Sequence, residues 1–352
     1  MAADPDVRAY GAVGDGSRDD TAAIQAAIDN GLALIPFGAF KVSGLTITRP
    51  DVLVRGYGFG SRLVLADGAD DHAIYISHQG ARSRLEDFAV DGNKAGQTAT
   101  SSGVRLAAEA NTVPLDDVQL RRLTIFDTQY AGIYINGGPG NLPVSGTLIE
   151  GCTLYGTDWH AILASWTAPN TRILNNHIKN TTSDDADGIR VGNGSDDCII
   201  SNNLIENTGD HSIEIQYAAR ATVVGNRIRN SGGFSIDIAA GCDNSVVTGN
   251  LVTDGPNAAG LAVEMARNVA VTGNTVKGCR RPVSLHDSDV SASITGNTFQ
   301  DCEKALKLSP DTVAAVITGN LFDNVGAPVF DDRTGGGPTI VFAHNTILEG
   351  SN

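Results

Sequence analysis

An asparagine returns at nearly constant intervals along the second half of the chain. From Asn176 to Asn345 the intervals are 27, 23, 24, 24, 23, 23 and 25 residues. A repeat of this length marks a supersecondary unit that stacks on its neighbours to bury a shared core. The period therefore predicts a solenoid, in which residues one repeat apart in sequence are neighbours in space.

Each repeat also carries short segments in which apolar and polar residues alternate, such as Gly188-Ile189-Arg190-Val191 and Ser212-Ile213-Glu214-Ile215. Alternation with period two is typical of strands with one buried face. The β-branched, Asn-rich and Gly-rich repeats lack the period of helices. Two or three short strands per repeat predict an all-β fold, a single-stranded parallel β-helix (solenoid). The recurring asparagine is interpreted as a ladder of stacked amides at a turn, with a structural role only.

Alignment of the strands predicts two columns of side chains about 4.8 Å apart from coil to coil. The buried column contains Ile133, Ile162, Ile189, Ile213, Ile236, Leu261, Val283 and Leu306. The adjacent column, expected to face solvent, contains Tyr134, Leu163, Arg190, Glu214, Asp237, Ala262, Ser284 and Lys307.

The N-terminal segment differs from the repeats. Residues 19–28 form an amphipathic pattern with an acidic first turn, which predicts a helix capped by Asp19 or Asp20. A helix here would cover the apolar end of the solenoid. We expect one domain over residues 1–352, with about 1–48 as the N-terminal cap and first strands and about 49–348 as stacked coils.

Composition restricts the possible partners. The net charge of −15 and pI near 4.7 argue against a general nucleic-acid surface, although a local basic groove remains compatible with them. No segment is apolar enough to span a membrane, and no secretory signal is visible. The five cysteines, an odd number without metal-ligand spacing, are interpreted as structural thiols: Cys152, Cys198, Cys242, Cys279 and Cys302.

Chemically versatile side chains concentrate on the coils between His160 and Glu264. The candidate catalytic residues are His160, Asp187, Asp210, His211, Glu214 and Asp237, and the candidate substrate-binding residues are Tyr134, Trp159, Trp166, Arg190, Gln216, Tyr217 and Glu264. Aromatic faces beside carboxylates suit sugar rings. The alternative is a solvated β-face with cross-strand ion pairs, such as Arg190 with Glu214.

Glu214 and Asp237 lie on adjacent coils, so one of the two is expected to have a raised pKa. Carboxyl groups on adjacent coils lie near the ~5 Å of retaining glycosidases, and skipping a coil gives about 9–10 Å, at the upper edge of the ~6.5–9.5 Å of inverting ones. Side-chain reach leaves the stereochemistry open. We expect no metal or cofactor. Asp184, Asp185 and Asp187 could bind Ca²⁺, but a charged turn is the preferred interpretation.

The segment Tyr10-Gly11-Ala12-Val13-Gly14-Asp15-Gly16, followed by residues 19–28, resembles the opening of the pectate-lyase-like right-handed β-helix superfamily. With the coils, the resemblance covers nearly the whole chain. It implies a right-handed β-helix and a carbohydrate substrate, and it leaves the reaction open among hydrolases, lyases, epimerases, transferases and tailspike depolymerases. An extracellular, periplasmic or phage-particle location is expected on the same ground.

A second resemblance is to the polygalacturonase family. It rests on Asp187-Gly188-Ile189, Gly209-Asp210-His211 and Gly232-Gly233-Phe234 in order and spacing. It implies that Asp187 and Asp210 are catalytic, with Asp210 as the acid. His211 and Phe234 depart from the family, which has aspartate and histidine there. The coil around Glu264 lacks the Arg-x-Lys that holds the substrate carboxylate.

Three functions follow as hypotheses. The first is cleavage or transfer of glycosidic bonds in a poly- or oligosaccharide by paired carboxylates. The second is a uronate lyase or C5-epimerase that uses histidine, Arg190 and tyrosine, although the Asp-Pro-His motif of the alginate epimerases is missing. The third is a noncatalytic glycan-binding module of tailspike type. The expected partner is a glycan, without nucleic acid or membrane, and the expected state is a monomer or homo-oligomer, a trimer if tailspike-like.

Overall fold

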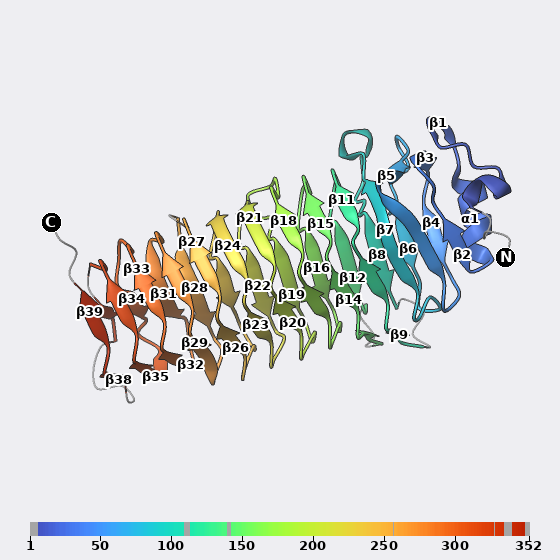
Figure 1. The fold of residues 1–352 in the computed structure, drawn as a ribbon. Helices are drawn as coiled ribbons and strands as arrows, with labels where there is room; N and C mark the ends of the chain where they lie inside the picture. The colour runs from blue at the N-terminus through green and yellow to red at the C-terminus, as the bar shows by residue number, and fades with distance from the viewer. Residues whose placement is uncertain are drawn as a thin grey trace. The chain divides into compact units, whose positions relative to one another are not determined.

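The computed structural model describes residues 6–108, 113–138, 142–255, 257–326, 328–333 and 340–348. The chain divides into two compact units, Met1–Thr182 and Ser183–Asn352, which are described one at a time. Both are built from short strands in parallel register (Figure 1). The all-β solenoid predicted from the repeat is confirmed, whereas the assignment of a single domain to residues 1–352 stays a prediction.

The first unit begins with short helices and continues as stacked strands. The 3-10 helices are η1 (Val7–Tyr10) and η2 (Lys94–Gly96), and the one α-helix of the described ranges is α1 (Thr21–Asp29). One stack consists of β4 (Leu45–Ile47), β6 (Ile74–Ile76), β8 (Val104–Ala107), β12 (Ile133–Asn136) and β16 (Ile162–Ser165). The remaining strands are β1 (Asp15–Asp19), β2 (Leu32–Leu34), β3 (Gly38–Val42), β5 (Leu53–Leu65), β7 (Arg84–Asp91), β9 (Leu115–Asp116), β10 (Gln119–Arg121), β11 (Thr124–Phe126), β13 (Val144–Ser145), β14 (Leu148–Glu150), β15 (Thr153–Tyr155), β17 (Arg172–Leu174) and β18 (His177–Lys179).

Helix α1 confirms the predicted amphipathic helix, but its start differs from the prediction. It buries Ile24, Ala27 and Ile28 against the first unit. The Asp20 carboxylate makes no capping bond to the helix, because it accepts hydrogen bonds from the backbone N–H groups of the preceding loop. Asp19 instead accepts from the first helical N–H, at 2.9 Å. The role of α1 as a cap over the end of the solenoid stays a prediction.

In the second unit each turn contributes three strands. One stack, here called the site sheet, consists of β19 (Ile189–Gly192), β22 (Ile213–Gln216), β25 (Ile236–Ile238), β28 (Ala259–Glu264), β31 (Arg281–His286), β34 (Leu306–Leu308) and β37 (Val329–Asp331). The other two stacks are β20 (Ile199–Ser201), β23 (Thr222–Val224), β26 (Val246–Thr248), β29 (Val269–Thr272), β32 (Val290–Thr295), β35 (Thr312–Thr318) and β38 (Ile340–Ala343), and β21 (Leu204–Thr208), β24 (Arg227–Ser231), β27 (Leu251–Thr253), β30 (Thr275–Lys277), β33 (Thr298–Gln300), β36 (Leu321–Asp323) and β39 (Thr346–Leu348).

The asparagine ladder stands at the bend between these two stacks. The side-chain oxygen of Asn250 accepts from both the backbone N–H (2.9 Å) and the amide (3.0 Å) of Asn226 on the preceding turn. The same pattern continues from Asn250 to Asn274 and on to Asn345. Glycine precedes most of these asparagines because the bend needs a left-handed backbone, as at Gly249 (φ 63°). The predicted amide ladder is confirmed.

The register predicted from the repeat is confirmed within each unit. Ile189, Ile213 and Ile236 pair in sequence along the site sheet and are fully buried. The neighbouring column was expected to face solvent, and for its acidic members this expectation is wrong. The side chains of Glu214 and Asp237 are only 9% and 3% exposed. Charged neighbours and the loops before each strand of the site sheet cover them, as described next.

Two further predictions concern the whole chain. All five cysteines are buried and have free thiols, as expected for structural residues. Burial raises the pKa of Cys152 to about 12, so the thiol stays protonated. In the described ranges, no helix has both the length and the apolar character needed to cross a membrane.

Candidate active site

The loops that lead into the site sheet approach one another closely, and glycines make this possible. A Cβ atom on Gly232 would lie 1.9 Å from the carbonyl oxygen of Gly209. A Cβ on Gly233 would lie 2.1 Å from Asp210 Oδ1 and 2.3 Å from His211 Nδ1. The Gly-Asp-His and Gly-Gly-Phe segments therefore have a steric reason: only glycine leaves room for the Asp210–His211 pair.

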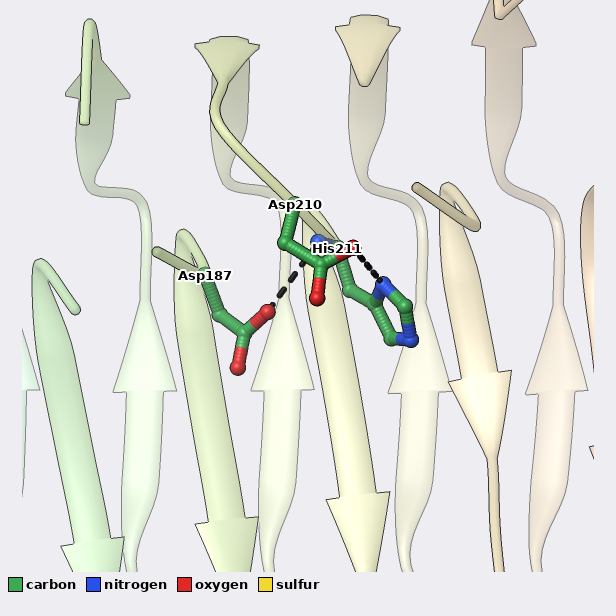
Figure 2. Close-up of side chains that lie close together, drawn as sticks. All are labelled: Asp187, Asp210 and His211. Atoms are coloured by element: carbon green, nitrogen blue, oxygen red, sulfur yellow. Dashed lines mark hydrogen bonds and ion pairs between the residues drawn. The ribbon is translucent and has the colours of Figure 1, made fainter. Parts of the chain in front are cut away.

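Asp187, Asp210 and His211 lie close together just before strands β19 and β22 of the site sheet begin (Figure 2). Asp187 lies just before β19, and its Oδ1 accepts a hydrogen bond of 3.0 Å from the backbone N–H of His211, just before β22. His211 Nδ1 lies 2.7 Å from Asp210 Oδ1. The Asp187 side chain is buried, whereas the Asp210 side chain is 34% exposed. Two carboxyl groups in different environments therefore contact one histidine, Asp187 at its backbone N–H and Asp210 at its ring.

Arg190 connects this group with the next turn. Its Nη1 lies 2.5 Å from Glu214 Oε2 and 3.4 Å from Asp187 Oδ2, and its Nη2 donates to Gln216 Oε1 at 3.2 Å. The cross-strand pair with Glu214 follows directly from the register of β19 and β22. The guanidinium thus lies against buried carboxyl groups of the protein itself.

A second carboxyl–histidine pair continues the row. Asp237 Oδ2 lies 3.6 Å from His211 Nε2, and Glu264 forms an ion pair with His286 on the next strand. The Phe234 ring lies between the two imidazoles, with centroid distances of 5.2 Å to His211 and 5.4 Å to His286. Acidic and cationic groups therefore alternate along the site sheet around one aromatic ring.

Burial is the main reason why two carboxyl groups here hold their protons. It raises the pKa of Asp187 to about 8, with help from the charge of Glu214 and against the opposing effects of His211 and Arg190. Burial is likewise the main reason why the pKa of Asp237 is raised to about 8, and the negative charges of Glu264 and Glu214 raise it further. A raised pKa for one of the two adjacent carboxyls Glu214 and Asp237 is what the register predicts, but burial outweighs the repulsion between them.

His211 shows the opposite balance. Burial lowers its pKa, but the hydrogen bond with Asp210 and the charges of Asp237, Asp210 and Asp187 outweigh this effect and raise it to about 9. At neutral pH the cluster therefore holds an imidazolium and neutral carboxyl groups beside carboxylates. Such an arrangement can both donate and accept protons.

These shifts predict that stability falls as the pH rises from 6 to 9. The folded protein keeps protons on Asp187 up to about pH 8 and on His211 up to about pH 9, whereas the unfolded chain releases them at their ordinary, lower values. Each such group lowers the free energy of unfolding by up to about 1.4 kcal/mol per pH unit in its window. In Asp187→Asn the slope between pH 6 and 8 should be shallower by about this amount, as measured by denaturant unfolding at several pH values. Equal slopes in both proteins would contradict the raised pKa of Asp187.

Several predicted site residues belong to the first unit. His160 is fully buried, and its ring lies against Trp159 at 4.1 Å. Tyr130, which the sequence did not single out, joins Trp159 (4.6 Å) to Tyr134 (5.6 Å). Trp166 is exposed and has a left-handed backbone (φ 54°) after β16. Whether these residues take part with the carboxyl cluster stays a prediction, and the complete burial of His160 favours a packing role.

Tyr217 in the second unit is exposed and also follows a strand of the site sheet with a left-handed backbone (φ 54°). The site residues predicted from the sequence did not include His286 or Phe234. Both lie at positions that the register places beside the cluster: His286 pairs with Glu264 across β28 and β31. The alternation of acidic and cationic residues one repeat apart was the signal that could have found His286.

Two groups of side chains offer spacings compatible with a metal ion: Asp187, Asp210 and His211, and Glu264, His286 and Asp287. In both groups, however, a histidine nitrogen already forms an ion pair with a carboxylate. These ion pairs account for the short spacing, so we assign no metal to either group. Asp184 and Asp185 are exposed and belong to neither group, and their assignment to a charged turn stays a prediction.

Comparisons with known proteins relate the chain to enzymes of alginate. Mannuronan C5-epimerase AlgE5 of Azotobacter vinelandii is 27% identical over 234 residues, 60% of this chain and 22% of that protein. Alginate lyase 7 of the same organism is 36% identical over 107 residues, 25% of this chain and 12% of that protein. The chain thus spans about a fifth or less of the length of these relatives.

The fold has a close counterpart among solved structures. The A-module of mannuronan C-5 epimerase AlgE6 from Azotobacter vinelandii superposes with a TM-score of 0.73 at 16% identity, covering 99% of this chain and 100% of that one. The model of the right handed beta helix region matches residues 72–252 and 180–352. The chain therefore belongs to the right-handed beta helix family, as its opening segment and its repeat both indicated.

Proposed function

We propose that this chain is a carbohydrate-active enzyme that acts on a polysaccharide, and that it cleaves or transfers glycosidic bonds at the Asp187–Asp210–His211 cluster. One observation carries the proposal: a buried neutral carboxyl and a more exposed carboxyl have oxygens within 4.8 Å of each other, and the more exposed one is paired with an imidazolium. Glycosidases divide the labour between a protonated and an ionised carboxyl group in this way.

The roles follow from the two environments. Asp187, with a pKa of about 8, would donate the proton to the leaving oxygen. Asp210, paired with the His211 imidazolium and open to solvent, would serve as base or nucleophile. This reverses the assignment implied by the polygalacturonase resemblance, which makes Asp210 the acid. The carboxyl separation is nearer to the ~5 Å of retaining than to the ~6.5–9.5 Å of inverting enzymes.

A uronate lyase or C5-epimerase is the second candidate, and the relatives favour it. Those relatives are named mannuronan C5-epimerases and an alginate lyase. Both reactions need a group that neutralises the substrate carboxylate and an unprotonated base for the C5 proton. Arg190 already contacts the carboxyl groups of Glu214 and Asp187. The raised pKa of His211 keeps its imidazole protonated at neutral pH. These two features make proton abstraction by this cluster less favourable than glycosidic cleavage.

One assay separates the candidates. The protein is incubated with alginate, polygalacturonate and neutral glucans while reducing ends, absorbance near 235 nm and exchange of the C5 hydrogen with deuterium are followed. Reducing ends without absorbance are the expected result. Absorbance would indicate a lyase and exchange without cleavage an epimerase, and either would overturn the proposed reaction. Binding without any turnover would instead support the noncatalytic glycan-binding module.

A further inference from the structure

A cavity of about 390 Å³ opens beside the carboxyl–histidine cluster in the second unit. Its size lies within the ~300–1,000 Å³ typical of small-molecule sites. Two residues of its lining contact the row of carboxyl and histidine groups: Phe234 lies against His211, and His286 pairs with Glu264. The remaining lining is provided by Asn257, Ala258, Ala259, Arg280, Arg281, Ser284 and Lys307. A ligand in this cavity would therefore lie beside Phe234, whose ring contacts His211 of the proposed catalytic cluster.

The cavity is cationic in a chain whose net charge is −15. Arg280, Arg281 and Lys307 all line it, and none of the three forms an ion pair with a residue of the described ranges. Most other arginines of this unit, such as Arg190 and Arg220, lie against carboxylates. Three cationic side chains around one cavity, only partly offset by Glu303 near Arg281, give it a positive potential that attracts anions.

Arg281 is the most constrained of the three. Its Nη1 donates to the carbonyl oxygen of Ala305 at 3.2 Å, which holds the guanidinium at the cavity wall. Burial lowers the pKa of Arg281, and the positive charge of Arg280 lowers it further. The negative charge of Glu303 has a smaller effect and offsets this only in part. A bound anion would relieve both unfavourable effects, whereas a neutral ligand would relieve neither.

The remaining walls suit a sugar. The Phe234 ring offers an apolar face for the C–H face of a pyranose, and Asn257 and Ser284 offer neutral hydrogen-bonding groups for hydroxyls. We propose that this cavity, built by Arg280, Arg281, Lys307 and Phe234, is a subsite that binds the anionic group of a sugar residue next to the one being processed. The substrate is accordingly a polyanionic glycan. The inference rests on the proposed function and adds the substrate's charge to it.

The test compares charge variants on charged and neutral glycans. Arg281→Gln, Lys307→Gln and the double variant are prepared together with Lys277→Gln, a control that removes an exposed lysine paired with Asp301 outside the cavity. Equilibrium binding to polygalacturonate, to a sulfated galactan and to a neutral glucan is measured at low and high salt. Circular dichroism checks that each variant is folded.

We expect each single cavity variant to weaken binding of the anionic glycan about 10- to 100-fold, because a charge-assisted hydrogen bond is lost. Lys277→Gln should bind like the parent protein, and preference for the uronate over the sulfated chain identifies carboxylate as the anion. Equal affinity of the parent protein for neutral and anionic glycans, or unchanged binding by the double variant, would overturn the proposal. Because binding is measured without turnover, this outcome is independent of whether the protein cleaves the glycan.

Discussion

Asp187→Asn is expected to lower the turnover of the polysaccharide about 10²- to 10⁴-fold while the protein stays folded. Asparagine keeps the acceptor for the backbone N–H of His211 and fills the same buried space, so the loop before β22 retains its position. It cannot donate the proton that a neutral carboxyl with a pKa of about 8 supplies. The effect should appear in kcat, measured by release of reducing ends, with little change in KM.

A matched control is Asp289→Asn, which removes an exposed carboxylate paired with Arg267 in the same unit. Its turnover should equal that of the parent protein, because exposed ion pairs contribute little and this one lies outside the cluster. Full activity of Asp187→Asn would remove Asp187 from the catalytic mechanism. Loss of activity in both variants would point to a general structural effect.

Asn250→Ala is expected to lower the free energy of unfolding by roughly 3–5 kcal/mol. The Asn250 side chain donates to the carbonyl oxygen of Val223 and accepts two hydrogen bonds from Asn226. Its removal leaves buried donors and an acceptor without partners, and each such group costs about 1–3 kcal/mol. Denaturant unfolding followed by circular dichroism measures the change.

Gln300→Ala provides the comparison. Gln300 also carries an amide that bonds to the next turn, but its single bond, to Asp323, is only partly buried. Water can replace it, so the expected loss is about 1 kcal/mol or less. If the two variants lose the same stability, the ladder contributes no more than any surface amide between turns.

The repeat predicted much of what the structure contains because one period equals one turn. It identified the strands of the site sheet, the pairing of Arg190 with Glu214 and the amide ladder through Asn250. It also gathered Asp187, His211 and Asp237 into one neighbourhood. Each of these depends only on which residues lie one turn apart, and the spacing of the chain fixes that relation.

Other features depend on packing between loops that are not periodic. The alternation of strands placed Glu214 and Asp237 on the outward face, yet Arg190 and the His211 loop cover them. The approach of these loops depends on Gly232 and Gly233, whose role is visible only when the contacts are known. The cationic cavity likewise assembles Phe234, Arg281 and Lys307 from the turns of β25, β31 and β34.

The sequence by itself therefore determined the architecture and which residues on adjacent turns are neighbours. It could do so because the asparagine period and the strand alternation are local and repeat along the chain. Only the tertiary structure decided the protonation of the site. The pKa values of Asp187 and His211 move in response to burial and to charges brought together by the loops. Burial is a property of the packed molecule, and no spacing of residues along the chain specifies it.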